Sequence, residues 1–99
     1  MSYLDFGLKL LRRAILECLD QVPDRSMTTA ELHIWISGWR YSWATMDLVE
    51  SCGQWLAEQG YVQSGEAATG MRLTLTDRGA DIAKSRVRVP GVAKSATEA

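Results

Sequence analysis

The 99-residue chain is short of cysteine, histidine and long apolar runs, and each shortage excludes a class of protein. Its two cysteines, Cys18 and Cys52, form no CxxC pair, and neither is close to His33, the only histidine. This excludes a disulfide framework and the usual zinc patterns, so we expect two buried structural thiols in a reducing compartment. No apolar stretch approaches the ~18 residues that a membrane-spanning helix needs, and charged residues interrupt the N-terminal apolar segment, unlike in a signal peptide. A cytoplasmic protein without membrane association is therefore predicted.

The sequence also lacks the groupings of side chains that carry catalysis. The serines, threonines and carboxylates form no recognisable triad, and the glycines form no phosphate-binding loop. His33 lies off the apolar positions of its segment, without a neighbouring cysteine, and is expected to be partly exposed. We therefore predict that the protein is not an enzyme and uses no cofactor or metal.

Charge is distributed unevenly along the chain, although the net charge is only −1. Residues 1–71 contain five basic and nine acidic residues, whereas residues 72–94 contain six basic and two acidic ones. An acidic body and a basic C-terminal third are expected to face different partners.

The first half of the chain has the periodicity of two helices. Apolar residues spaced by three or four predict a long amphipathic helix over residues 3–21, ending before Pro23. Its apolar face is wider than one short neighbour would cover, so part of it is expected to form a homodimer seam. The residues assigned to that seam are Leu4, Leu8, Leu11 and Ile15.

A second helix is predicted to begin at the capping box Thr28–Glu31 and to run to about residue 39. Its inner face is expected to consist of residues at the spacing i, i+3, i+4 and i+7, which are Leu32, Trp35, Ile36 and Trp39. A short break leads to a third helix over about residues 43–59, ending at Gly60. Trp55 on its inner face is expected to be the most deeply buried residue.

The periodicity changes after Gly60. Residues 61–64 and 73–76 are predicted strands of a hairpin with its tip at 65–70, followed by a short helix over 77–85. Residues 86–99 are predicted to form a basic, extended or mobile tail, so the domain is placed at 1–85. The expected fold class is mainly α with a small β-hairpin: a three-helix core, a two-stranded wing and a closing helix.

Two segments resemble motifs of the winged helix-turn-helix superfamily, as found in small bacterial and phage regulators. Residues 54–62, QWLAEQGYV, resemble the end of a recognition helix entering the first wing strand. Residues 73–79, LTLTDRG, resemble the second wing strand and the Thr-x-x-Gly turn into the closing helix. The segment Val89–Val92 is more loosely similar to small winged-helix proteins of Mu-like transposable phages.

The resemblance implies a protein that binds double-stranded DNA, as a small transcriptional regulator or a DNA-handling accessory factor of bacterial or phage origin. Its third helix would enter the major groove, while the wing and the basic tail would contact the DNA backbone. The residues assigned to DNA contact are Arg40, Ser42, Trp43, Met46, Arg72, Arg78, Lys84, Arg86 and Arg88.

An alternative function stays open because Asp47 and Glu50 lie on the outward face of the third helix, where carboxylates would repel phosphate. The aromatic cluster from Trp39 to Trp43 is too dense to face inward entirely, and aromatic side chains are frequent at protein interfaces. The alternative is a winged-helix adaptor or assembly factor that binds a protein partner at Trp39–Trp43 without binding DNA.

Overall fold

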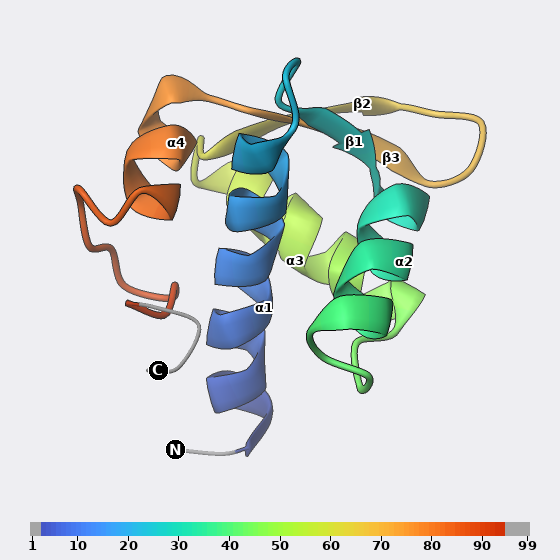
Figure 1. The fold of residues 1–99 in the computed structure, drawn as a ribbon, viewed down its shortest axis with the longest axis horizontal. Coiled ribbons are helices and arrows are strands. Elements are labelled where there is room, and N and C mark those ends of the chain that lie inside the picture. Colours follow the sequence, from blue (N-terminus) through green and yellow to red (C-terminus); the bar gives the residue numbers. More distant parts are fainter. Residues whose placement is uncertain (1–2, 95–99) are drawn as a thin grey trace.

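The protein folds into an α+β domain of helices around a small antiparallel sheet. The computed structural model describes the backbone of residues 3–94 and the side chains of residues 5–94. The elements in chain order are α1 (Tyr3–Gln21), β1 (Ser26–Thr28), α2 (Thr29–Trp39), α3 (Met46–Glu58), β2 (Val62–Glu66), β3 (Met71–Leu75) and α4 (Asp77–Ala83). The sheet lies across one end of the helices, with α1 between α4 and α2 (Figure 1).

Threonine side chains begin three of the four helices. Thr28, Thr45 and Thr76 each accept a hydrogen bond from the backbone N–H three residues later, which satisfies a donor that the helix leaves free. At Thr28 the predicted capping box is confirmed, and its hydrogen bonds to the Glu31 carboxylate lower the pKa of that group. The Thr45 cap starts α3 at Met46, three residues later than predicted.

The sheet contains a third strand, β1, which the sequence pattern did not predict. The predicted hairpin is present as β2 and β3, but β3 also pairs with β1, giving the order β1-β3-β2. Met27 of β1 lies opposite Leu73, and both side chains are buried. A strand of three residues is too short for an alternating pattern, so only its pairing with a distant segment reveals it.

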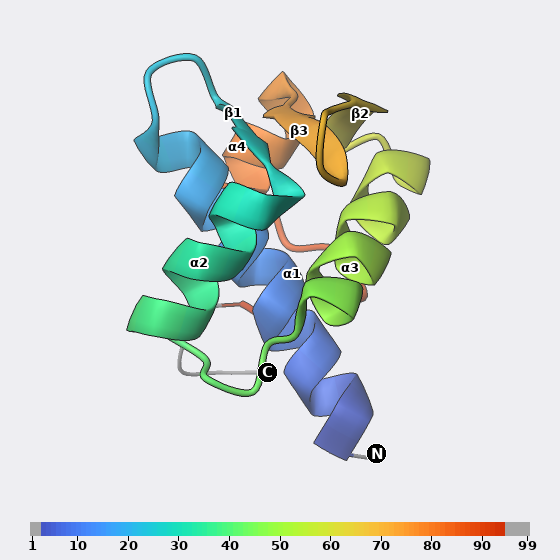
Figure 2. The ribbon, with the colours of Figure 1, turned by 90° about the vertical axis from the view of Figure 1, so that its right-hand side faces the viewer.

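The core occupies the space between α1, α2, α3 and the inner face of the sheet (Figure 2). Leu11 and Ile15 are fully buried in this core, so they have no surface left for the predicted dimer seam. Leu8 is half-buried against the same core, and the side chain of Leu4 lies outside the described residues. The wide apolar face of α1 is covered by the protein itself, because α2, α3 and α4 all pack against this helix.

Two tryptophan predictions are wrong. Trp55 is only half-buried, because its indole faces the edge of the core, where the Arg12 guanidinium lies 4.1 Å from the ring centroid. Trp35 and Trp39 were expected to point inward, but their side chains are 54% and 80% exposed. The buried face of α2 is instead formed by Thr29, Leu32 and Ile36, which α1, α3 and the sheet cover.

Residues 86–94, which we call the strap, pack back onto α1 rather than forming a free tail. The Ala93 N–H donates to the Lys9 carbonyl at 3.2 Å, and Arg12 donates to the Gly91 carbonyl at 3.0 Å. Val92 and Ala93 are buried. The domain therefore extends beyond the predicted boundary at residue 85, because backbone groups of the strap find partners on α1. The rest of the predicted tail, 95–99, lies outside the described residues.

Candidate interaction surfaces

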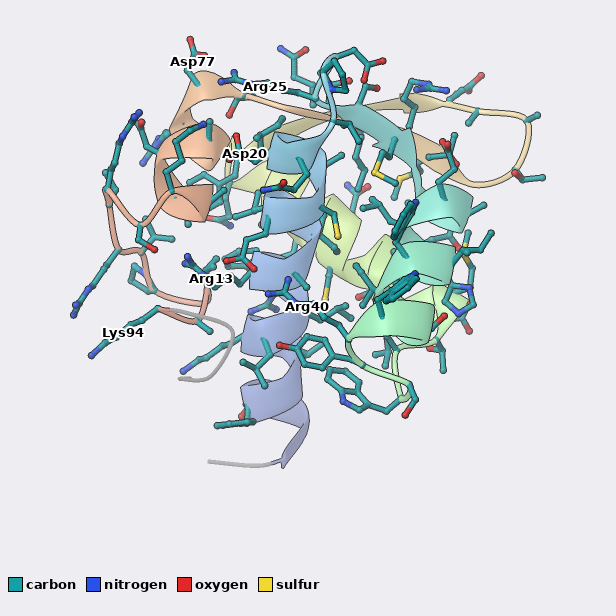
Figure 3. The ribbon with its side chains drawn as sticks, viewed as in Figure 1. Arg13, Asp20, Arg25, Arg40, Asp77 and Lys94 are labelled. Carbon is teal, nitrogen blue, oxygen red and sulfur yellow. The ribbon has the colours of Figure 1, made fainter. Side chains whose placement is uncertain are left out.

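Three of the cations predicted to contact DNA are already paired with carboxylates. Arg40 binds Glu17, Lys84 binds Asp20 at 2.7 Å, and Arg86 binds Asp81 at 3.3 Å. Each pair reduces the positive charge that these side chains offer to a phosphate. Figure 3 shows that Arg40 lies close to α1, away from the sheet.

The other predicted basic residues form no salt bridge among the described residues, although Arg72 is near enough to Glu31 to help lower its pKa, and they are dispersed. Arg72 donates to the Ser26 hydroxyl on the outer face of the sheet, and the Arg78 guanidinium lies 5.5 Å from the Tyr61 ring centroid. Arg88 projects from the exposed part of the strap, as does Lys94, which points outward in Figure 3. These side chains come from β3, α4 and the strap, so they form no continuous stripe with α3.

The outward face of α3 is acidic. Asp47 and Glu58 are exposed and Glu50 is half-buried, while the segment Met46–Glu58 contains no lysine or arginine. A recognition helix normally meets the phosphate backbone with basic side chains around its base-reading residues. This face has the opposite charge from the one that DNA reading by α3 requires.

Of the predicted contact residues near the start of α3, Ser42 and Trp43 are separated from the basic wing residues, whereas Met46 lies beside the hairpin tip. Ser42 and Trp43 lie in the connection between α2 and α3, at the far end of the domain from the sheet (Figure 1). Trp43 stacks on Tyr41 with ring centroids 5.1 Å apart, and its ring lies beside Gly7 of α1. Met46 is half-buried and lies close to Gly70 at the hairpin tip. The structure thus does not gather the predicted DNA residues into one surface.

Three of the six exposed large apolar side chains in the described part of the chain lie on α2. Ile34, Trp35 and Trp39 are 67%, 54% and 80% exposed, and the two indoles are stacked with centroids 6.3 Å apart. Gly38 lies between them on the same side of the helix, where an added Cβ would meet no described atom within 4 Å. We call Ile34, Trp35, Gly38 and Trp39 the outer face of α2.

A shallow apolar hollow continues this face toward α1 and β1. It has a volume of about 340 Å³ and is lined by Cys18, Gln21, Val22, Met27 and Trp35. Of the predicted protein-binding cluster Trp39–Trp43, only Trp39 belongs to the outer face of α2. The exposure of Ile34 was predictable from the sequence, because this residue does not belong to the predicted inner face of its helix. The exposure of Trp35 was not, because periodicity assigns its position to the core.

Both cysteines have the raised pKa of shielded thiols rather than the lowered pKa of reactive ones. Burial raises the pKa of Cys52 to about 11 and also raises that of Cys18. Within the described residues no group of three or more histidine, cysteine, aspartate or glutamate side chains could hold a metal ion. In the same residues no helix has the length and apolar character needed to cross a membrane.

Because the pKa of Cys52 is raised, we expect the protein to lose stability at alkaline pH. The pKa of this thiol is higher in the folded protein than in the unfolded chain. The contribution of the protonated thiol to the free energy of unfolding is therefore complete below pH 9 and is lost between pH 9.0 and about 11. Urea unfolding at pH 8 and pH 10.5 should show a larger decrease in the free energy of unfolding for the wild type than for Cys52→Ala. Equal decreases in the two proteins would contradict this assignment.

Comparison of the chain with protein-family models, with curated proteins and with solved structures gives no match.

Proposed function

We propose that this protein is a small winged-helix adaptor that acts through protein contacts made by the outer face of α2. The winged-helix assignment is supported by the element order, in which α2 and α3 are joined by residues 40–45 and followed by the β2–β3 hairpin and α4. The short strand β1 between α1 and α2, paired with β3, also fits a winged helix.

The observation that carries the proposal is the exposed, stacked pair Trp35 and Trp39 beside Ile34. Isolated apolar residues are ordinary on a protein surface, but a contiguous group that includes two indoles indicates an interaction site. Tryptophan is also among the residues that contribute most to binding energy at interfaces, because it buries a large area with few rotatable bonds.

DNA binding, as a regulator or accessory factor, is a second candidate, and its support lies outside α3. Arg72, Arg78 and Arg88 form no salt bridge among the described residues and are exposed. Contacts from these side chains would be directed to phosphates and would be strongly salt-dependent. This candidate has less support than the adaptor, because the outward face of α3 is acidic and would repel phosphate.

The two functions can be separated by substitutions that leave the core intact. Trp39→Ala removes the most exposed indole of the outer face and should reduce recovery of cross-linked protein partners from the native host at least tenfold. The full-length tagged chain would be cross-linked in cells, and co-purified proteins would be quantified by mass spectrometry.

Val87→Ala is the matched control, because Val87 is an exposed apolar residue on the strap, and its truncation should leave recovery unchanged. Equal recovery with the wild type and Trp39→Ala would contradict the adaptor function. Salt-dependent binding to duplex DNA, weakened by Arg78→Ala and unaffected by Trp39→Ala, would instead support the second candidate.

A further inference from the structure

The strand β2 forms one edge of the sheet and is paired on one side only. β3 lies between β2 and β1, and α3 is the helix that packs against β2. Figure 2 shows β2 as the outermost strand, above α3, on the side of the sheet away from β1 and α2. Among the described residues, no further helix or strand packs extensively against β2. Its outer edge is therefore open.

The alternation of hydrogen bonds along β2 shows which backbone groups point outward. The Thr76 N–H donates to the Tyr61 carbonyl at 3.2 Å, directly before the paired strands begin. Hydrogen-bonded positions alternate in an antiparallel pair, so Gln63 is the next residue that bonds to β3. The N–H and C=O groups of Ser64 and Glu66 therefore point away from β3, and both residues are exposed. They offer the donors and acceptors that an added strand uses.

The usual protections of an edge strand are missing from β2. The segment Val62–Glu66 contains no proline, lysine or arginine, and its register with β3 is continuous, without a bulge. Natural proteins commonly use such features to keep other strands away from an exposed edge. The charge on this strand is that of Glu66, which repels an acidic segment but attracts a basic one.

The helix beneath the open edge is acidic on the side that an added strand would cover. Gly53 faces the sheet, because a Cβ at this position would lie 2.8 Å from a leucine methyl of β3. With about 3.6 residues per turn, the other buried residues of α3 lie on one side of Gly53, toward the core. Asp47, Glu50 and Glu58 lie on the opposite side, beneath the open edge of β2.

Glu66 extends this acidic side to the strand itself. Ser64 lies opposite Leu73, whose side chain is directed at Gly53 of α3. Opposite residues share a face of the sheet, and so do alternate residues of one strand, so Glu66 also lies on the face toward α3. The carboxylates on this side form no salt bridge among the described residues. We call them the acidic flank, and they are Asp47, Glu50, Glu58 and Glu66.

We propose that the open edge of β2 binds an extended, basic segment of a partner protein as a fourth strand. Backbone pairing with Ser64 and Glu66 sets the register, and every second side chain of the segment then lies over the acidic flank. Lysine or arginine at those positions meets carboxylates that form no ion pair within the described protein. Charge excludes a second copy of this chain at the same edge, because two acidic flanks would meet. It also excludes nucleic acid, whose phosphates these carboxylates repel.

This site is separate from the outer face of α2. Figure 2 shows α2 under β1 at one side of the sheet, and α3 under β2 at the other. A protein with both surfaces can hold two partners at once, as an adaptor does. The proposal does not rest on the α2 face, so Trp39→Ala should leave binding at β2 unchanged.

Titration of the isotope-labelled full chain with a defined peptide, followed by nuclear magnetic resonance, tests the proposal. The probe is acetylated and amidated Thr-Lys-Thr-Lys-Thr-Lys-Thr, whose lysines can all lie on one face of an added strand. The amide signals of Ser64 and Glu66 should shift, and exchange of these amides with solvent should slow. The same peptide with N-methylated backbone at each lysine keeps its charge but cannot donate to the edge. It should bind about tenfold more weakly or worse.

Substitutions in the protein test the backbone and the charge separately. Ser64→Pro removes an N–H that points away from β3, a position where an edge strand tolerates proline, and should weaken binding of the lysine peptide about tenfold. Combining Glu50→Gln with Glu66→Gln should weaken it about fivefold at low salt. Asp24→Asn is the matched control, because it removes a carboxylate in the turn before β1, at the opposite edge of the sheet. Its affinity should stay that of the wild type.

The proposal is overturned if the lysine peptide leaves the Ser64 and Glu66 signals unmoved, or if the N-methylated peptide binds equally well. Equal affinity for Thr-Glu-Thr-Glu-Thr-Glu-Thr, or no loss in the glutamine double variant, would show that the acidic flank does not select the partner. None of these results touches the proposed adaptor, whose own test is the recovery of cross-linked partners with Trp39→Ala.

Discussion

Replacing Gly79 with alanine should destabilise the domain by about 3 kcal/mol or more, since overpacking against rigid backbone is at the upper end of such effects. Gly79 lies in the first turn of α4, where a Cβ would come within 2.1 Å of the Tyr61 carbonyl oxygen and 2.7 Å of a Leu75 methyl. The Tyr61 carbonyl cannot retreat easily, because it accepts hydrogen bonds from the Thr76 N–H and the Thr76 hydroxyl. Gly79→Ala must therefore push α4 away from the start of β2.

Urea unfolding followed by circular dichroism measures this loss. Gly65→Ala is the matched control, because Gly65 lies in β2 and a Cβ there would meet no described atom within 4 Å. Its free energy of unfolding should change by less than about 1 kcal/mol. Similar losses for the two variants would show that the contact between Gly79 and Tyr61 does not limit stability.

The second large effect is expected at Arg13, whose replacement by methionine should cost about 3 kcal/mol, as when a buried charged network loses one partner. Arg13 is 4% exposed, yet all five of its side-chain N–H groups have acceptors. They reach Glu17, the Ile82 and Ala83 carbonyls at the end of α4, the Ser85 hydroxyl and the Ala93 carbonyl of the strap. Methionine keeps much of the volume of Arg13 but leaves these acceptors without their donors.

The Arg13→Met substitution should also loosen the strap locally, in addition to lowering the free energy of unfolding. Amide hydrogen exchange should become faster at Ala93, whose N–H bonds to Lys9 beside Arg13, because the strap loses its anchor on α1. Arg88→Met should leave both exchange and stability nearly unchanged, since Arg88 is exposed and bonds to none of the described residues. If Arg13→Met keeps the slow exchange of Ala93, the guanidinium does not hold the strap.

Local chemistry made much of the secondary structure predictable. The bounds of α1 follow from its periodicity and the turn at Pro23, and the Thr28–Glu31 capping box marks the start of α2. Gly60 ends the α3 segment with φ at +82°, a conformation that glycine adopts without strain. These signals act within one turn of the chain, so the neighbouring residues alone determine them.

The candidate site was only partly predictable. Sequence reasoning placed a protein contact near Trp39 and noticed the carboxylates of α3, but it assigned Trp35 to the core and made α1 the dimer helix. Periodicity defines which residues share a face, but it does not say how much of that face its neighbours cover. In this fold α1 is covered on most sides, while α2 is short and lies at the edge.

The sequence by itself determined the bounds of α1 and α2 and the approximate places of α3, the hairpin and α4, because caps, turns and periodicity are local. Only the tertiary structure decided the pairing of β1 with β3, the docking of the strap and the exposure of the α2 indoles. Each of these depends on hydrogen bonds or packing between residues far apart in the chain, such as Arg13 and Ala93. Those contacts form only when the whole core is assembled, and they leave the outer face of α2 exposed.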